Sequence, residues 1–162
     1  MARSRSNASD PFAAALRLLT LRDRSEAELR RKLKQFGFSL SAIDEAVDKC
    51  LEYAYLDDSR YAKERARTLM RSGRAVGQKI RQDLYRRGLS EALIHQALEY
   101  VESELSAEQI LQDQLERRFP DFDYSTADEK HRRRVVSYFQ RRGFHLDQIF
   151  ACIKNPSASQ PF

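Results

Sequence analysis

Side chains that could carry catalytic chemistry are few and scattered along this 162-residue chain. The three histidines, His95, His131 and His145, do not have the spacing of metal ligands. The adjacent carboxylates of Asp57 and Asp58 could bind a metal or take part in acid–base chemistry. No other ligand-type residue accompanies them, however, and capping of a helix start explains both carboxylates fully. We therefore expect no catalytic residue and no metal site.

One glycine-containing segment has some likeness to a phosphate-binding loop, because Gly73 and Gly77 precede Lys79. That motif requires a glycine, four further residues, and then glycine, lysine and serine or threonine, all directly after a β-strand. This spacing is absent here, and no strand pattern precedes the glycines. We interpret the segment as a turn between helices, and we expect a protein that is not an enzyme and has no cofactor.

Basic residues, in contrast, gather in three separate clusters. The chain has a net charge of +5 and a pI near 9.4, which permits an acidic or polyanionic partner. Cations that complement a helix C-terminus are common, so one arginine alone indicates little. A cluster that occurs three times favours a surface that binds an anionic partner. The candidate partner-binding residues are Arg30, Arg31 and Lys34 in the first cluster, Lys79, Arg81, Arg86 and Arg87 in the second, and Arg132, Arg133, Arg134, Arg141 and Arg142 in the third.

Each cluster lies within a sequence pattern that occurs three times. Gly37, Gly88 and Gly143 mark the pattern and are 51 and 55 residues apart. Apolar residues occupy the same five positions around each glycine: the eighth and fourth before it, and the first, sixth and tenth after it. They are Leu29, Leu33, Phe38, Ile43 and Val47; Ile80, Leu84, Leu89, Ile94 and Leu98; and Val135, Phe139, Phe144, Ile149 and Ile153. Self-similarity at this period indicates a repeat protein.

The repeated pattern predicts two helices joined at the glycine. Apolar residues four positions apart lie on one face of a helix. A glycine can adopt the left-handed conformation that ends a helix, and the apolar residue after it packs back on the last turn. Ser39 and Ser90 are suited to cap the next helix, whereas His145 at the equivalent position is a weaker cap. If equivalent helices stack, the basic clusters would line one face of a curved array.

Capping residues place the other helices. A first helix begins near Asp10 and Pro11. Ser25 and Glu28 form a capping box for a second helix, which ends at Gly37 and is followed by a third. No segment shows a convincing strand pattern, so the chain predicts an all-α fold of three tandem three-helix repeats in an elongated, curved array. The expected divisions are a flexible tail at 1–10, repeats at 11–56, 57–104 and 105–154, and a C-terminal tail at 155–162.

The third repeat contains extra residues between its first two helices. Its first helix begins near Ser106, and Pro120 should end it because proline is unfavourable inside a helix. The aromatic residues that follow are expected to plug the base of the repeat rather than to stack on nucleic-acid bases.

Cysteine usage and hydropathy indicate a cytoplasmic protein. Cys50 and Cys152 both lie in apolar helical segments, where a buried, reduced thiol is expected. No secretory signal marks an oxidising compartment. No apolar run approaches the roughly 20 residues that a membrane span requires.

Three longer segments resemble the RecX family of regulatory proteins, which modulate the bacterial recombinase RecA. The segments are residues 22–33 (RDRSEAELRRKL), 55–62 (YLDDSRYA) and 79–89 (KIRQDLYRRGL). Together with the three-repeat layout, they extend the resemblance over residues 12–154. The turn from Gly73 to Gly77 is spaced differently from the family's usual glycine-rich turn, and the third repeat is more divergent.

The resemblance implies a curved monomer that binds in the helical groove of the filament formed by RecA on single-stranded DNA. Family members restrain filament assembly and dampen its ATP hydrolysis, strand exchange and coprotease activity. A basic concave array could span neighbouring RecA subunits and approach the DNA phosphates, where arginine contacts are strong and sensitive to salt.

Two other functions remain open on the residues alone. A helix, a glycine turn and a second helix superficially resemble a helix-turn-helix that would bind duplex DNA directly. Against this, the helices after each glycine are acidic or mixed, and the basic helices precede the turn. The chain could also be a helical scaffold for an acidic protein, with no role at nucleic acid.

Overall fold

A computed structural model describes residues 10–155 of the chain. Within that range the chain forms nine α-helices and no strand, which confirms the all-α prediction. The tails predicted at 1–10 and 155–162 lie outside the described residues, apart from Asp10 and Asn155. No described helix is long and apolar enough to cross a lipid bilayer. The helices are α1 (Pro11–Leu21), α2 (Glu26–Gln35), α3 (Leu40–Glu52), α4 (Asp58–Arg71), α5 (Gln78–Arg86), α6 (Glu91–Glu104), α7 (Ala107–Arg118), α8 (Glu129–Gln140) and α9 (Leu146–Lys154).

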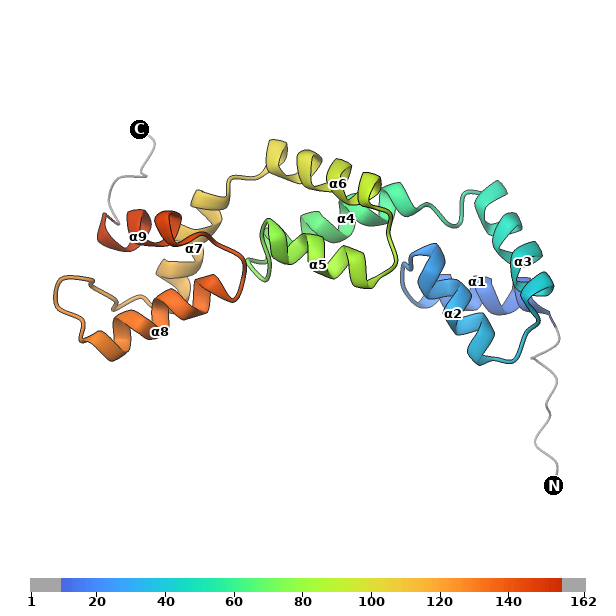
Figure 1. Cartoon of the computed structure of the whole chain (residues 1–162), viewed down its shortest axis with the longest axis horizontal. Helices are drawn as coiled ribbons and strands as arrows, with labels where there is room; N and C mark the ends of the chain where they lie inside the picture. Colours follow the sequence, from blue (N-terminus) through green and yellow to red (C-terminus); the bar gives the residue numbers. More distant parts are fainter. Residues whose placement is uncertain (1–9, 156–162) are drawn as a thin grey trace, which may run out of the picture.

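The helices form three consecutive groups of three along an elongated, bent molecule (Figure 1). Helices α1–α3 form repeat one, α4–α6 form repeat two and α7–α9 form repeat three. The middle helices α2, α5 and α8 lie along the lower, concave edge in this view, and α3, α6 and α9 lie above them. The predicted arrangement of three repeats in a curved array is therefore confirmed.

Side-chain caps begin the helices where the sequence indicated. The Asp10 carboxylate accepts a hydrogen bond from the Phe12 amide at 3.0 Å at the start of α1. Ser25 and Glu28 satisfy each other's free amides in a capping box at α2. The Ser39 hydroxyl accepts from the Ala42 amide at 3.2 Å and begins α3. These caps fix the helix starts from local sequence alone.

The three repeat glycines end the middle helices as predicted. The φ angles are 89° at Gly37, 78° at Gly88 and 99° at Gly143. This is a left-handed backbone conformation that residues with a side chain rarely adopt. The amide of the apolar residue after each glycine donates back to the carbonyl four residues before the glycine. These bonds are Phe38 to Leu33 at 3.4 Å, Leu89 to Leu84 at 3.4 Å and Phe144 to Phe139 at 3.3 Å. They satisfy carbonyls that a helix end otherwise leaves unpaired.

The apolar repeat positions form the core. All fifteen are buried except Phe38 and Leu98, which are half-buried. Repeat one has a hydrophobic cluster of its own, from Ala14 to Leu56, whereas one continuous cluster from Tyr61 to Ile153 joins repeats two and three. Both cysteine thiols are free, and burial raises the pKa of Cys50 and brings that of Cys152 to about 11.

The extra segment of repeat three also follows its prediction. Helix α7 ends at Arg118, two residues before Pro120. Phe119, Phe122 and Tyr124 pack, half-buried, against the joint core of repeats two and three. The Phe119 ring meets Tyr138 edge-on at 5.2 Å between centroids. The aromatic residues thus pack against the core at this end of the repeat, as expected.

Candidate anion-binding interface

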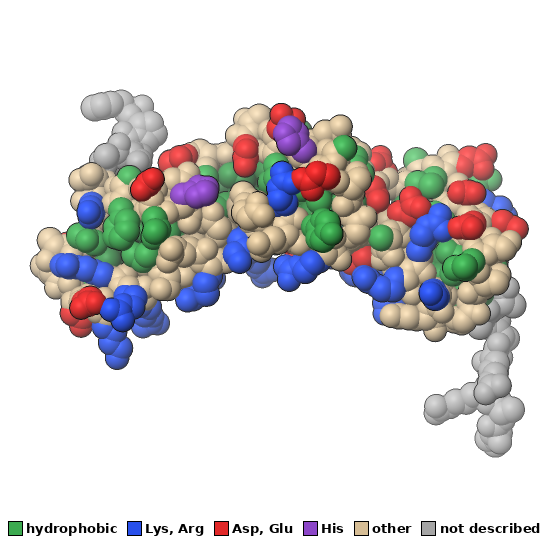
Figure 2. Space-filling view, viewed as in Figure 1, with side chains coloured by type: hydrophobic (Ala, Val, Ile, Leu, Met, Phe, Trp, Pro, Cys, Tyr) green, Lys and Arg blue, Asp and Glu red, His purple; other side chains and the backbone are tan. Residues whose placement is uncertain are grey.

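The basic clusters lie on the middle helices and at their ends. On the face drawn in Figure 2, many Lys and Arg side chains follow the lower, concave edge, and many Asp and Glu side chains lie toward the opposite edge. Helices α2, α5 and α8 form that concave edge in the same view (Figure 1). The sequence-predicted clusters from three separate repeats therefore share one side of the molecule.

An equivalent contact joins each middle helix to the next and explains this alignment. The Arg87 carbonyl accepts a hydrogen bond from the Ser25 hydroxyl at 2.5 Å. The Arg142 carbonyl accepts one from the Val76 amide at 2.8 Å. Ser25 and Val76 each stand twelve residues before their own repeat glycine, and Arg87 and Arg142 each stand just before theirs. The end of one middle helix thus meets the start of the previous one in the same way twice.

The repeat glycines permit this close approach. A Cβ atom at Gly88 would lie 2.4 Å from the Cβ of Ala27, and one at Gly143 would lie 2.4 Å from the carbonyl oxygen of Val76. At Gly37, which has no preceding repeat, a Cβ would meet nothing within 4 Å. The repeated sequence pattern predicted only helix ends at these glycines. Their second role was not predicted, because it depends on contacts between repeats.

Five of the candidate cations are exposed and have no ion pair with any residue between 10 and 155. Helix α2 carries two of them, α5 carries one, and the last two lie on and just after α8. They are Arg31, Lys34, Arg86, Arg134 and Arg141. Half-buried Lys79 also lacks such a pair, and its side chain lies beside the Gly143 turn. These are the groups that an anionic partner can reach without breaking an existing ion pair.

Three further candidates are held in ion pairs near the surface. Arg30 contacts Glu26 at 2.8 Å and Asp44 at 2.5 Å, and its hydrogen bond with Glu26 raises the pKa of its guanidinium. Arg81 pairs with Glu91, and Arg133 pairs with Glu129. Exposed ion pairs contribute little to stability, typically about 0–1 kcal/mol. A partner carboxylate or phosphate can therefore replace these acids at small cost.

The side chains of the remaining three candidates make structural contacts within the molecule. Arg87 is half-buried between repeats one and two. Arg132 donates to the Tyr124 carbonyl at 2.9 Å and lies over the Tyr124 ring. Arg142 lies 3.5 Å from the centroid of the Tyr138 ring and donates to the carbonyl of the same residue at 3.0 Å. Sequence could not separate Arg87 from its exposed neighbour Arg86, because its partner Glu28 lies 59 residues away.

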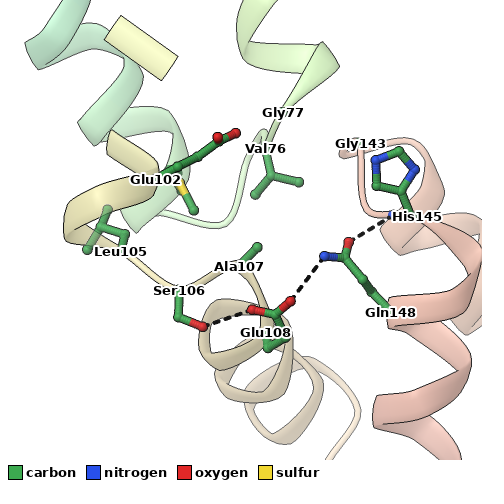
Figure 3. Close-up of a pocket in the computed structure, with 11 residues that line it drawn as sticks. Val76, Gly77, Glu102, Leu105, Ser106, Ala107, Glu108, Gly143, His145 and Gln148 are labelled. Carbon is green, nitrogen blue, oxygen red and sulfur yellow. Dashed lines mark hydrogen bonds between the residues drawn. The ribbon is translucent and has the colours of Figure 1, made fainter. Parts of the chain in front are cut away.

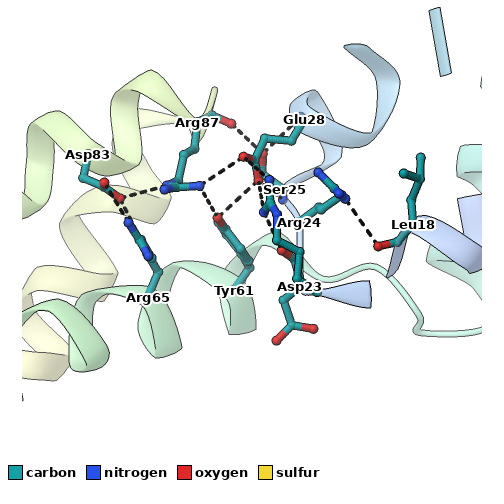
Figure 4. A network of polar contacts seen from close by, with 10 residues as sticks. Leu18, Asp23, Arg24, Ser25, Glu28, Tyr61, Arg65, Asp83 and Arg87 are labelled. Carbon is teal, nitrogen blue, oxygen red and sulfur yellow. Dashed lines mark hydrogen bonds and ion pairs between the residues drawn. The ribbon is translucent and has the colours of Figure 1, made fainter. Parts of the chain in front are cut away.

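The Arg87 side chain belongs to a polar network between repeats one and two (Figure 4). It contacts Glu28 at 3.0 Å, Asp83 at 2.9 Å and the Tyr61 hydroxyl at 3.0 Å. Glu28 is only 5 % exposed and also pairs with Arg22 at 3.2 Å. Burial by itself would raise the pKa of Glu28, but the hydrogen bonds from Arg22 and the Ser25 amide bring it below its ordinary value.

The second carboxylate of this network, Asp83, behaves in the same way. Burial acts to raise its pKa, and hydrogen bonds from Arg65 and Arg87 lower it overall. The Arg65 contact is 3.0 Å long. Both acids therefore stay ionised at neutral pH, and the network is a set of paired charges.

Asp57 and Asp58, the adjacent carboxylates, cap two different helices. Asp57 accepts from the Arg60 amide at 2.9 Å and begins α4. Asp58 accepts from the Glu26 amide at 2.8 Å and so caps α2 of the preceding repeat. Capping was the predicted role, and the structure adds that one of the two caps reaches across the junction. Burial raises the pKa of Asp58.

A hollow of about 440 Å³ lies between repeats two and three (Figure 3). Glu108 accepts hydrogen bonds from Ser106 at 3.0 Å and from the Gln148 amide at 3.2 Å. The Gln148 oxygen accepts from the His145 amide at 3.2 Å. These contacts join α7 to α9. With Glu102 and Glu108 in its lining, the hollow does not suit an anion.

Family comparison agrees with the fold and with the resemblance seen in the sequence. Residues 12–50, 57–98 and 106–153 match the family models described as the first, second and third three-helix domains of RecX. The chain belongs to the RecX family. The predicted resemblance is thereby confirmed for all three repeats.

Relatives and solved structures extend this RecX match. The regulatory protein RecX of Syntrophotalea carbinolica is 45% identical over 142 residues, which cover 88% of this chain and 93% of that protein. The regulatory protein RecX of Vibrio parahaemolyticus is 34% identical over 136 residues, or 84% of each chain. The crystal structure of RecX from Lactobacillus salivarius has a TM-score of 0.67 at 22% identity, covering 90% of this chain and 94% of that one. At this identity the structural likeness concerns the fold.

Proposed function

We propose that this RecX-family protein binds the filament of RecA on single-stranded DNA, in the helical groove of that filament. There it inhibits filament extension, ATP hydrolysis, strand exchange and coprotease activity. The proposal assigns no catalytic step to the chain, which acts in the cytoplasm as a monomer. Its working units are the repeats at 11–56, 57–104 and 105–154. The known role of the RecX family supplies the partner.

The observation that best supports the proposal is the alignment of α2, α5 and α8 along one concave edge. The repeated contacts of Arg87 with Ser25 and of Arg142 with Val76 maintain that alignment. A curved row of cations suits a partner that is itself repetitive and anionic. Contacts from arginine to phosphate or carboxylate are strong, and contacts to DNA weaken steeply with salt.

The candidate cations divide into two groups within this function. Arg31, Lys34, Lys79, Arg86, Arg134 and Arg141 are available for RecA carboxylates or DNA phosphates, and Arg30, Arg81 and Arg133 become available when their surface ion pairs exchange. Arg87 holds repeats one and two together, and Arg132 and Arg142 stabilise repeat three, so these three do not bind the partner. We therefore expect different consequences from charge reversal in the two groups.

The decisive experiment is an assay of the ATPase activity of RecA on single-stranded DNA with this protein titrated in. The chain should lower the ATPase rate. The variant with Arg86→Glu and Arg141→Glu should need at least about tenfold more protein for the same inhibition, because two exposed cations are lost. Its circular dichroism spectrum and melting temperature should match those of the parent.

A matched control places the same charge change elsewhere on the surface. Lys49 on α3 and Lys154 on α9 are exposed and lie outside the middle helices. The variant with Lys49→Glu and Lys154→Glu should inhibit as the parent does. Equal loss in both variants would show that net charge matters and the concave edge does not, and a parent without any effect on RecA would refute the function.

A further inference from the structure

An exposed aromatic side chain on the middle helix of repeat two has no side-chain partner within residues 10–155. Tyr85 lies on the outer face of α5 and is 70 % exposed. Its hydroxyl makes no hydrogen bond there, and its ring meets no other ring. Tyr53 and Tyr55 are also exposed, but their rings lie 5.9 Å apart and contact each other. An isolated exposed aromatic ring is unfavourable in water and is available for an external partner.

Tyr85 forms one wall of a shallow hollow of about 340 Å³. Arg81, Arg86 and Glu91 line the hollow together with the side-chain amides of Gln78 and Gln82. Most of the exposed lining is apolar, since the phenol ring and the side-chain stems supply it. The hollow thus combines a flat aromatic surface, two amides and a basic rim.

The charges around the hollow distinguish its centre from its rim. Arg81 pairs with Glu91, so these two lining charges neutralise each other. Arg86 is exposed, and its only contact among described residues is a 3.3 Å hydrogen bond to the carbonyl of Gln82. The centre therefore suits a neutral, flat group, and the rim suits an anion beside it. An unpaired nucleotide has this combination in its base and its phosphate.

We propose that Tyr85 stacks on an unpaired base of single-stranded DNA while Arg86 contacts the adjacent phosphate. The inference rests on the proposed function only in placing single-stranded DNA along the concave edge. Exposed aromatic rings in a basic groove bind single strands in this way, and every base offers a flat face, so the contact tolerates any sequence. Gln78 and Gln82, which also line the hollow, carry amides of the kind that hydrogen-bond base edges.

This proposal concerns a different region from the aromatic segment of repeat three, whose residues are expected to pack rather than to stack on bases. That expectation concerned the segment after α7, where it agrees with the packing of Phe119 against the core. Tyr85 instead lies in the last turn of a basic helix, α5. The sequence pattern of that helix predicted its charged residues and its buried face, and gave no role to Tyr85.

The test uses the absence of tryptophan from the chain. The Tyr85→Trp variant of the full-length protein carries a single tryptophan, whose fluorescence a stacked base quenches. Oligothymidylate should quench it at low salt, and an abasic oligonucleotide of the same length, with phosphates but no bases, should not. In the matched Tyr53→Trp variant, the tryptophan lies just after α3, and oligothymidylate should leave its fluorescence unchanged.

Affinity provides a second readout. Tyr85→Ala should weaken binding of fluorescently labelled oligothymidylate by at least about fivefold in an anisotropy titration, the lower end of the effect of one stacking residue. Tyr85→Phe keeps the ring and should bind within about twofold of the parent, since stacking does not require the hydroxyl. Both substitutions are on the surface and should leave the melting temperature unchanged.

Several outcomes would overturn the proposal. Equal quenching by the abasic and thymidine strands would mean that only phosphate approaches Tyr85. Unquenched fluorescence, with or without DNA binding, would exclude stacking. If Tyr85→Ala binds DNA normally but inhibits the RecA ATPase less, the ring contacts RecA protein instead. Inhibition of the RecA ATPase by the parent chain is measured separately. The stacking proposal can therefore fail while the proposed function stands, and the reverse.

Discussion

The two junctions between repeats share one geometry but differ in what stabilises them. Repeat one meets repeat two through the charged side chains of Glu28, Arg87 and Asp58. Repeat two meets repeat three within a single hydrophobic cluster, to which Val76 and Phe144 both belong. Equivalent residues supply the contact between middle helices in both cases. The position of a repeat is thus set by the close approach at the glycine turn, and the remaining chemistry of the junction can vary.

The difference predicts unequal stability along the array. The stability of a repeat protein is approximately the sum of repeat and interface terms. Buried ion pairs need complete pairing because each unpaired charge is costly, whereas apolar contact tolerates small displacements. Repeat one, with its separate core and its charged junction, should therefore open before repeats two and three. Four predictions test this comparison.

The largest effect is expected from Gly143→Ala at the apolar junction. The new methyl group would overlap the Val76 carbonyl oxygen, and the residue would also keep its strained φ of 99°. We expect a loss of about 3 kcal/mol in the free energy of unfolding, from the strain and from the broken contact. Gly37→Ala, which has a similar φ but meets nothing, should cost only about 1–2 kcal/mol. If urea denaturation shows that Gly143→Ala and Gly37→Ala lose the same free energy of unfolding, the close approach at Gly143 does not stabilise the junction.

Glu28→Ala should have the next largest effect, and it should be confined to one end of the molecule. It leaves half-buried Arg87 without one of its two carboxylates and the Tyr61 hydroxyl without an acceptor. A loss of about 2 kcal/mol is expected. Hydrogen exchange should accelerate in α1–α3 and stay unchanged in α7–α9. Uniform acceleration along the chain would contradict the picture of separate junctions.

Gly88→Ala should destabilise by about 1.5–2 kcal/mol, because its methyl group would overlap the Cβ of Ala27. Ala27→Gly removes the opposing methyl group and should relieve the overlap, although it weakens α2. A double-mutant cycle should give a favourable coupling of about 0.5 kcal/mol or more. Strict additivity of the two substitutions would show that the helices do not touch there.

The smallest effect is the pH dependence of the charged junction. The pKa values of Glu28 and Asp83 are lowered by folding, so their stabilisation is complete above the ordinary carboxyl range and is lost as the pH falls through the lower folded values. The pKa of Asp58 is raised by folding, so Asp58 acts in the opposite direction and reduces the net change of stability with pH. Amide protection in the helices that meet at this junction, α1–α5, should decline between about pH 5 and 3 before that in α7–α9. Parallel decline in all helices would count against this.

The repeat pattern predicted the local structure well. The positions of Leu29 and Leu33 predicted a buried face, and Gly37 predicted the left-handed helix end, because both depend on neighbours within a few residues. The separation of exposed cations from structural ones was not predictable. Arg86 and Arg87 are adjacent in sequence, yet the first is exposed and the second lies in a network with Glu28, which is 59 residues away.

The amino-acid sequence by itself determined the helices, their caps, the three-fold repetition and the membership of the RecX family. These follow from spacing, charge and turn chemistry within single repeats. Only the tertiary structure decided that the basic helices share one concave edge, that Asp58 caps a helix of another repeat and that Tyr85 is left exposed. The physical reason is that such contacts join residues distant in the chain. Whether two such residues meet depends on how closely backbones can approach, and neither local propensity nor periodicity encodes that distance.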